Sequence, residues 1–213
     1  MELNVERLMG KFYTPKELES IFEAKAESIS PTEFIRRPQH KGLKEMWCAV
    51  RFGLGYEKFV GPCLINVDLE ENCDADFVVK TDAGEFPFQT RIADVPERRM
   101  GDDYKPKPDG TLSMQPYEPE RGRIEGPGWI AAAVKEKVQK RYSTAKNLNL
   151  LIYANFSAHD LDYKAVCNAV REYRDEFASI WVITNHQICS LAASAGLGEI
   201  REFSIIYSPE ELL

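Results

Sequence analysis

The hydrophobic pattern of the first part of the chain has the period of an α-helix. Apolar residues recur at helical spacing as far as about residue 29, with Thr14 as N-cap and Pro15 at the first helical position. Ser30 is expected to end this helix, because a residue that precedes proline avoids the helical conformation. A second apolar stripe over residues 43–55 predicts a helix that is buried over most of its circumference.

Beyond residue 60 the pattern changes to that of β-strands. Residues 63–67, 76–81 and 86–92 are predicted as strands, and the turn that contains Gly84 makes the last two a β-hairpin. Pro87 cannot donate a hydrogen bond to a sheet. We therefore expect it at the start of a strand or on a free edge.

Residues 96–127 contain many Pro, Gly, Arg and Asp residues and have no sustained period. A segment of this length without regular structure predicts a long loop that acts as a lid or insertion. Its glycine-rich end, residues 122–128, is interpreted as a turn that delivers Trp129 into the core. The alternative is a helix start whose backbone N–H groups bind an anion.

Helices and strands alternate in the C-terminal part. Residues 129–142 and 163–177 have helical spacing, whereas residues 149–154 and 180–184 are nearly continuous apolar runs that predict buried strands. Residues 203–207 are predicted as a last short strand. A strand, a helix and a further strand form a βαβ unit, which predicts parallel pairing with a right-handed crossover.

These elements together predict one α/β domain over residues 1–213, with a mixed central sheet flanked by helices. Its expected regions are N-terminal helices in residues 1–58, a sheet hairpin region in 60–95, the long loop in 96–127 and an αβαβ region in 128–213.

Composition and charge narrow the class of protein. The chain is 44% hydrophobic and 29% charged, as in globular proteins. A net charge of −7 argues against a protein that coats nucleic acid through its overall field, although a local basic groove remains open. Five cysteines without a C-x-x-C pair indicate reduced thiols. With no signal-like segment and no long apolar run, the sequence predicts a cytoplasmic protein without a membrane span.

Residues of the predicted hairpin resemble a known catalytic motif. Asp76 stands at the start of one strand, Gln89-Thr90-Arg91 lies on the next, and Glu45 lies on the preceding helix. With the element order, this pattern resembles the PD-(D/E)XK nuclease-like superfamily, which has a restriction-endonuclease-like αβββαβ core and an (E/Q)-x-K motif. The resemblance covers about residues 43–154 and leaves a C-terminal βαβ extension.

The resemblance implies metal-dependent hydrolysis of phosphodiester bonds in DNA or RNA. It implies Asp76 and Gln89 as ligands of Mg²⁺, Arg91 as the residue that stabilises charge on the phosphate, and Glu45 as an assisting acid. Residues 89 and 91 point to the same face of a strand, as this site requires. Arginine does not readily surrender a proton, so Arg91 departs from the lysine of the family. Lys137 or Lys140 on the next helix is an alternative.

Other interpretations remain open. In one of them, the chain is a catalytically degenerate descendant of such a nuclease. In another, it is a non-catalytic module that binds nucleic acid or a protein through residues 96–127. A third interpretation is an unrelated hydrolase with Cys189 as nucleophile.

The candidate residues also have structural interpretations. Asp76 would then bond its own turn, Gln89 and Arg91 would lie on a solvent-facing side of the hairpin, and Glu45 would form a salt bridge with Lys41 one turn earlier.

Overall fold

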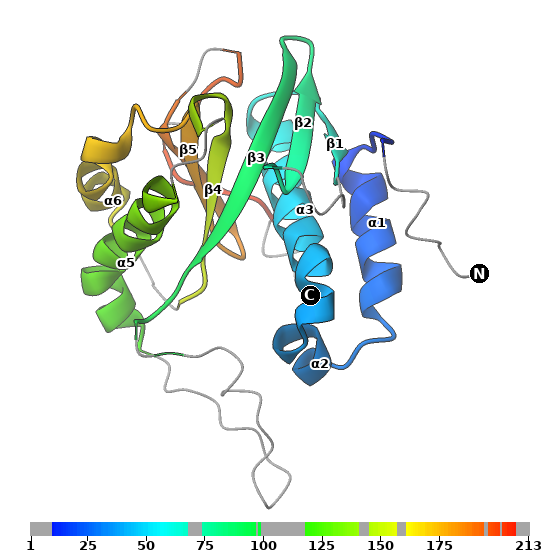
Figure 1. The fold of residues 1–213 in the computed structure, drawn as a ribbon, viewed down its shortest axis with the longest axis horizontal. Coiled ribbons are helices and arrows are strands. Elements are labelled where there is room, and N and C mark those ends of the chain that lie inside the picture. The colour runs from blue at the N-terminus through cyan, green and yellow to red at the C-terminus, as the bar shows by residue number, and fades with distance from the viewer. Residues whose placement is uncertain are drawn as a thin grey trace, which may run out of the picture.

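A seven-stranded mixed sheet lies between two layers of helices (Figure 1). The computed structural model describes residues 10–67, 74–96, 98, 118–140, 145–156, 161–193, 196–200 and 202–207. Helices α1 and α3 cover one face of the sheet, and α5 and α6 cover the other (Figure 1). The predicted α/β class, with a mixed sheet flanked by helices, is therefore confirmed.

The strands lie side by side in the order in which they occur along the chain. Pairing is antiparallel from β1 to β3, parallel from β3 to β5, and antiparallel from β5 to β7. The helices are α1 (Pro15–Ala26), α2 (Pro31–Arg36), α3 (Lys41–Phe59), α5 (Pro119–Gln139) and α6 (Tyr163–Ala169). The strands are β1 (Leu64–Asn66), β2 (Phe77–Thr81), β3 (Gly84–Ala93), β4 (Asn149–Ala154), β5 (Ser179–Ile183), β6 (Gln187–Ala192) and β7 (Ser204–Ile205).

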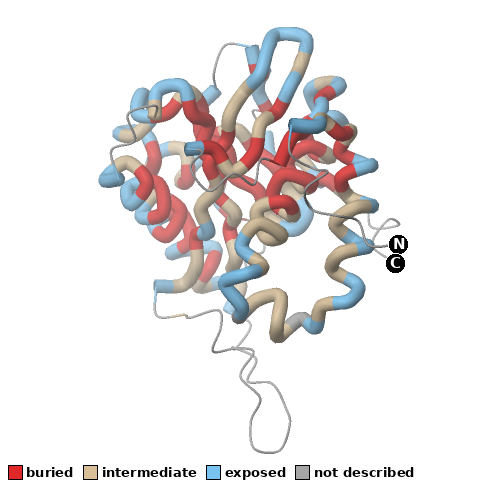
Figure 2. Tube along the Cα trace, turned by 45° about the vertical axis from the view of Figure 1, so that its right-hand side comes forward, coloured by how far each residue is buried: buried red, intermediate tan, exposed pale blue. Residues whose placement is uncertain are grey.

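The hydrophobic core forms one layer on each face of the sheet, and buried segments run through the centre of the molecule (Figure 2). Rings dominate the layer under α3. Phe52 lies 4.6 Å from Phe88 and 5.2 Å from Trp181, measured between ring centroids. Aliphatic residues such as Ile130 and Leu150 fill the layer under α5. These two layers hold β3 and β4 in a fixed position between them.

The N-terminal helices begin at side-chain caps that the sequence predicts. The Thr14 hydroxyl accepts the Glu17 backbone N–H, and the Glu17 carboxylate accepts the Thr14 N–H, which makes a capping box. Helix α1 ends at Ala26, earlier than predicted. Ser30 does more than end the first helix, because its hydroxyl caps α2. Helix α3 is longer at both ends than the predicted 43–55.

The predicted hairpin between β2 and β3 is confirmed. Phe77 pairs with Phe88 and Thr81 with Gly84, and Gly84 has a positive φ of 138°, which favours glycine. Strand β3 pairs with β4 only from Phe88 onward. Pro87 therefore lies in the part of β3 that has no pairing with β4, in agreement with the prediction.

The predicted loop over residues 96–127 is wrong for its last part, because α5 already begins at Pro119 and includes residues 122–128. Gly126 packs there instead of forming a turn. A Cβ on Gly126 would lie 2.6 Å from the Phe156 ring, so only glycine allows this close approach. Residues 97 and 99–117 lie outside the described residues, and a role of this segment in partner binding stays a prediction.

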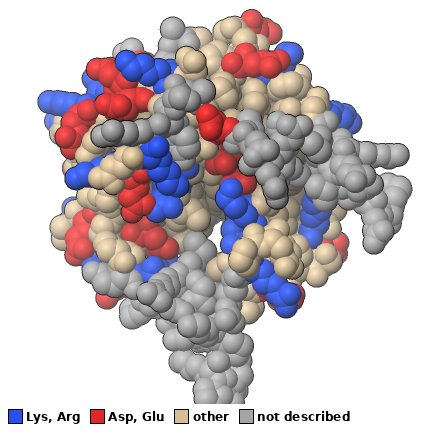
Figure 3. Space-filling view, viewed as in Figure 1, with Lys and Arg blue, Asp and Glu red and all other residues tan. Residues whose placement is uncertain are grey.

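Ion pairs along the exposed side of α5 support its first turns. Arg121 pairs with Glu125 at 3.2 Å, and Arg123 pairs with Glu120 at 2.6 Å. Pairs three or four residues apart favour the helical state and offset part of the cost of glycine and proline. Acidic and basic side chains are similarly interspersed over the face of the molecule in Figure 3.

The C-terminal part differs from its prediction in detail. Strands β4 and β5 are parallel as predicted, but α6 ends at Ala169 and is followed by a short 3₁₀ turn, Arg171–Tyr173. Strand β6 has no counterpart among the predicted strands, because its apolar residues form only a short run that Ser190 interrupts. In the part of the chain that the structure describes, no helix is long and apolar enough to cross a membrane.

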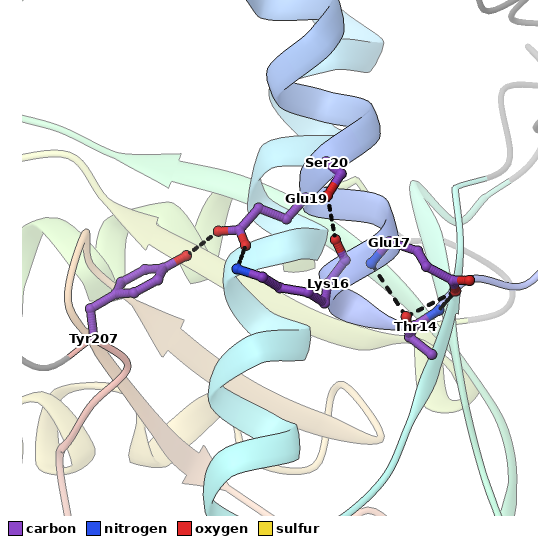
Figure 4. A network of polar contacts seen from close by, with 6 residues as sticks. All are labelled: Thr14, Lys16, Glu17, Glu19, Ser20 and Tyr207. Atoms are coloured by element: carbon purple, nitrogen blue, oxygen red, sulfur yellow. Dashed lines mark hydrogen bonds and ion pairs between the residues drawn. The ribbon is translucent and has the colours of Figure 1, made fainter. Parts of the chain in front are cut away.

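Residues far apart in sequence meet at α1. The Tyr207 hydroxyl donates to the Glu19 carboxylate at 2.6 Å, and Glu19 also pairs with Lys16 (Figure 4). On its other side, the Tyr207 ring lies under the guanidinium of Arg51, which belongs to α3. The segment after β7 is thereby held against both helices of this layer.

Because α5 includes both Gly126 and Gly128, substitutions of these two glycines should have opposite effects. Gly126→Ala should lower the free energy of unfolding by about 1–3 kcal/mol, because the new methyl group would overlap the Phe156 ring. Gly128→Ala, which meets open space, should raise it by about 0.5–1 kcal/mol, since alanine favours a helix. Urea unfolding of both variants measures the difference. Equal effects would contradict a helix that packs on Phe156.

Candidate functional site

Asp76 lies immediately before β2 and is bonded across to β3. Its Oδ2 accepts the backbone N–H of Thr90 at 2.6 Å and the Thr90 hydroxyl at 2.7 Å. Its own backbone N–H donates to the carbonyl of Phe88 at 2.7 Å. These bonds fix the carboxylate against β3 instead of within its own turn.

Glu45 brings a second carboxyl group to Asp76 from α3. Its side chain is 16% exposed and pairs with Lys41 at 2.9 Å, so the predicted salt bridge is present. Burial raises the pKa of Glu45, and the negative charge of the Asp76 carboxylate and contact with it raise it further. The two acids therefore form a crowded and poorly hydrated pair, here called the acidic pair.

Lys137 approaches from the opposite side of the sheet, on α5. Its side chain is buried and its Nζ donates a hydrogen bond to Oε1 of Gln89. Burial lowers the pKa of Lys137 to about 8, while the charge of Asp76 opposes this shift. Lys137 thus feels the charge of Asp76 and holds a labile proton near neutral pH.

Gln89 and Arg91 share the face of β3 that is turned to α5. The side-chain N–H of Gln89 donates a hydrogen bond to the backbone carbonyl of Asp74. The side-chain oxygen of Gln89 accepts a hydrogen bond from Lys137. Gln89 is therefore buried, and its interpretation as a solvent-facing residue is wrong. Arg91 is partly exposed and pairs with Glu136 on α5, and its Nε is buried without an acceptor.

The site is split between the two faces of β3. Thr90 lies on the α3 face with the acidic pair, since side chains alternate along a strand, whereas Gln89 lies on the α5 face with Lys137. Asp76 lies just before β2, which begins at Phe77, and its carboxylate bonds to Thr90. Among the described residues β3 has no β2 partner beyond Phe88, and Asp74 and Asp76 bond to β3 there.

The donor set suits a small hard cation only in part. Within the described ranges there is no cluster of three or more His, Cys, Asp and Glu side chains. Mg²⁺ is commonly bound by one or two carboxylates, with water and substrate phosphate completing its shell, so the acidic pair fits this ion. Gln89 Oε1 accepts a hydrogen bond from the Lys137 ammonium group. The predicted role of Gln89 as a metal ligand therefore requires that lysine to move.

Sequence reasoning did not give Thr90 a role and named Lys137 only beside Lys140. Thr90 occupies the variable position of the motif, and only its alternation with Phe88 places it on the α3 face. Lys140, in contrast, is exposed at the end of α5. The choice between these two lysines follows from the helical phase, because Lys137 shares the buried face of Ile130 and Val134 and Lys140 does not.

Cys189 is a packing residue in the structure. It is 1% exposed in β6, and burial raises the pKa of its thiol to about 12, so little thiolate forms at neutral pH. The thiol donates to the carbonyl of Ile200. The four cysteines of the described ranges are all free, and Cys73 lies outside them.

No protein-family model, curated protein or solved structure matches this chain. The candidate site therefore rests on the geometry and chemistry of its own residues.

The buried lysine predicts a pH-dependent stability. Between about pH 8 and its ordinary pKa of 10.5, the unfolded chain binds a proton that folded Lys137 does not hold. The free energy of unfolding of the wild type should therefore rise over this range relative to Lys137→Met, by about 1–2 kcal/mol with partial exposure allowed for. Urea unfolding at several pH values measures this. Lys135→Met, at an exposed position of α5, is the control, and parallel pH curves for wild type and Lys137→Met would contradict the prediction.

The acidic pair predicts the opposite sign on the acid side. Folded Glu45 holds a proton above the ordinary glutamate pKa, so its stabilising contribution is complete below that pKa and is lost as pH rises through the raised value. Without divalent cations, Glu45→Gln should melt a few degrees above the wild type at pH 7.5, because the charge repulsion is gone. This difference should shrink toward pH 4. Glu57→Gln, at an exposed position of α3, is the control; equal melting temperatures of Glu45→Gln and wild type at both pH values would argue against the pair.

Proposed function

We propose that the chain is a nuclease-like protein of the PD-(D/E)XK type, which hydrolyses phosphodiester bonds of DNA or RNA with a divalent cation. The observation that carries this proposal is that Asp76 and Lys137 bond to neighbouring residues of β3, Asp76 to Thr90 and Lys137 to Gln89, with Glu45 beside Asp76. The order α3, β1, β2, β3, α5, β4 agrees with the αβββαβ core of that superfamily.

In this proposal the acidic pair holds the cation. Glu45 and Asp76 supply two carboxylates, and Thr90 fixes the direction of the Asp76 carboxylate through its two hydrogen bonds. A Mg²⁺ ion bound there would polarise a phosphoryl oxygen and make a bound water more acidic. The raised pKa of Glu45 is consistent with a place for positive charge between the two acids.

Lys137 takes the place that the sequence resemblance gave to Arg91. Its ammonium group would bind an oxygen of the phosphate and stabilise the negative charge that develops there. Gln89 orients Nζ by accepting one of its protons. Arg91 is engaged by Glu136 on the α5 side and would act only on the more distant part of the substrate.

The binding-only alternative has one observation in its favour. Asp76 Oδ2 is satisfied by Thr90, and both polar ends of Gln89 are satisfied by Asp74 and Lys137, without any ion. A degenerate descendant would keep these bonds for stability and would bind nucleic acid without cleaving it.

Hydrolysis of single- and double-stranded DNA and RNA in the presence of Mg²⁺ tests the proposal. Asp76→Asn and Lys137→Met should each reduce the cleavage rate by about 100-fold or more, as loss of a group that stabilises transition-state charge does. The matched controls are Asp82→Asn in the hairpin turn and Lys135→Met on α5, which should retain the wild-type rate. If the wild type cleaves none of the four substrates, the proposed hydrolysis is contradicted and the binding-only alternative remains.

Calorimetric titration with Mg²⁺ and with Mn²⁺ separates metal binding from cleavage. The wild type should give a binding heat that Asp76→Asn and Glu45→Gln lose and Asp82→Asn retains. An unchanged heat in Asp76→Asn would place the cation elsewhere and would contradict the role of the acidic pair.

A further inference from the structure

A pocket of about 210 Å³ opens beside the acidic pair, between α2, α3 and the carboxyl ends of β3 and β4. Its walls are almost entirely apolar and include the side chains of Phe34, Trp47, Ile92 and Tyr153. The rings of Trp47 and Tyr153 meet edge to face, with centroids 4.7 Å apart. The guanidinium of Arg51 lies 5.3 Å from the Trp47 ring. Trp47 is thus held between groups that fix its orientation.

Two polar residues, Lys44 and Asn155, also border the pocket. Lys44 donates its Nζ to the carbonyl of Ile35 at 2.7 Å, and Asn155 donates its side-chain amide to Asp94 at 3.1 Å. Their polar ends are thus held by the protein itself, so the surface offered to a ligand is apolar.

The pocket adjoins the acidic pair along two elements. On β3, Ile92 follows Thr90 by two residues on the same face, a step of roughly 6–7 Å. On α3, the pocket residues Lys44 and Cys48 lie on either side of Glu45 in sequence. Burial raises the pKa of Cys48, and the charges of Asp76 and Glu45 raise it further, as expected for a thiol between pocket and acids.

We propose that this pocket binds one unpaired nucleobase of the nucleic-acid strand whose phosphate lies at the acidic pair. This inference rests on the proposed function and names its substrate class. A volume of 210 Å³ is below the roughly 300–1,000 Å³ of pockets for larger ligands, and it suits a flat ring. Aromatic walls stack on bases of any sequence.

The position of the pocket favours a single-stranded substrate. A base inside a duplex is stacked and paired, so it enters such a pocket only after it leaves the stack, at a cost of a few kcal/mol. An unpaired base does not require this. The pocket therefore predicts a preference for single-stranded segments over intact duplex.

Paired probes isolate the contribution of the bases. Asp76→Asn serves as background, so that binding is measured without cleavage, by fluorescence anisotropy of a short oligodeoxythymidylate and of an abasic oligonucleotide of equal length. The two probes carry the same phosphates. Base stacking of about 1–3 kcal/mol predicts that the thymidylate binds roughly 5- to 150-fold more tightly.

Filling the pocket should remove this preference. Ile92→Trp places a large ring at its mouth, and Ile92 is already 36% exposed, so the fold should tolerate the change. The ratio of the two affinities should fall close to one in Ile92→Trp and, to a lesser degree, in the smaller Ile92→Phe. Ile205→Trp on β7, where the isoleucine is 47% exposed, is the matched control and should keep the ratio.

The outcomes separate this inference from the proposed function. If the protein without the Asp76 substitution cleaves DNA or RNA but the preference survives Ile92→Trp, the base pocket is overturned and hydrolysis stands. If neither DNA nor RNA is cleaved, but the thymidylate binds more tightly than the abasic probe and Ile92→Trp removes this difference, base binding in the pocket is supported and the proposed hydrolysis is contradicted. Equal binding of both probes, or binding of neither, overturns the pocket.

Discussion

The parallel pairing of β3 with β4 is the constraint on which the rest of the structure depends. Two parallel neighbours need a crossover connection, and helix α5 supplies it between them. The buried Asn149 fixes the pairing, because it donates to the carbonyl of Pro87 and accepts the Ser179 hydroxyl. The crossover places Lys137 over Gln89, so the strand arrangement brings this cation to the strand that also bonds Asp76 through Thr90.

Hydrophobic periodicity predicted most strands of the sheet and the helix that carries Glu45, because these elements bury regular apolar faces. It failed for the start of α5, where Gly126 and Pro127 argue for a turn. The helix there depends on the contact between Gly126 and Phe156, a residue thirty positions away that a local pattern does not reveal. Asp76 and Glu45 were proposed from their place in the element order, through the resemblance to a known motif. Thr90 was given no role and Lys137 was named only beside Lys140, because their positions follow from strand alternation and helix phase.

The electrostatics of the site are local. The chain carries a net charge of −7, and acidic and basic groups are interspersed on the face in Figure 3. A strand of phosphates would therefore be attracted by a few placed groups rather than by the whole surface. Glu45 and the buried Lys137 lie on opposite sides of one strand, and each has a pKa displaced toward neutral pH. Such opposed shifts are costly for stability and are typical of sites that handle protons.

The bond between Tyr207 and Glu19 has a consequence for synthesis of the protein on the ribosome. Helix α3 is covered on one side by α1, which is made before it, and on another by residues such as Ile188 and Ile206, which are made much later. The helix that presents Glu45 and Trp47 therefore keeps exposed apolar surface until these later residues emerge. Closure of this layer thus has to wait for β6 and β7, and until then the apolar face of α3 favours aggregation of the nascent chain.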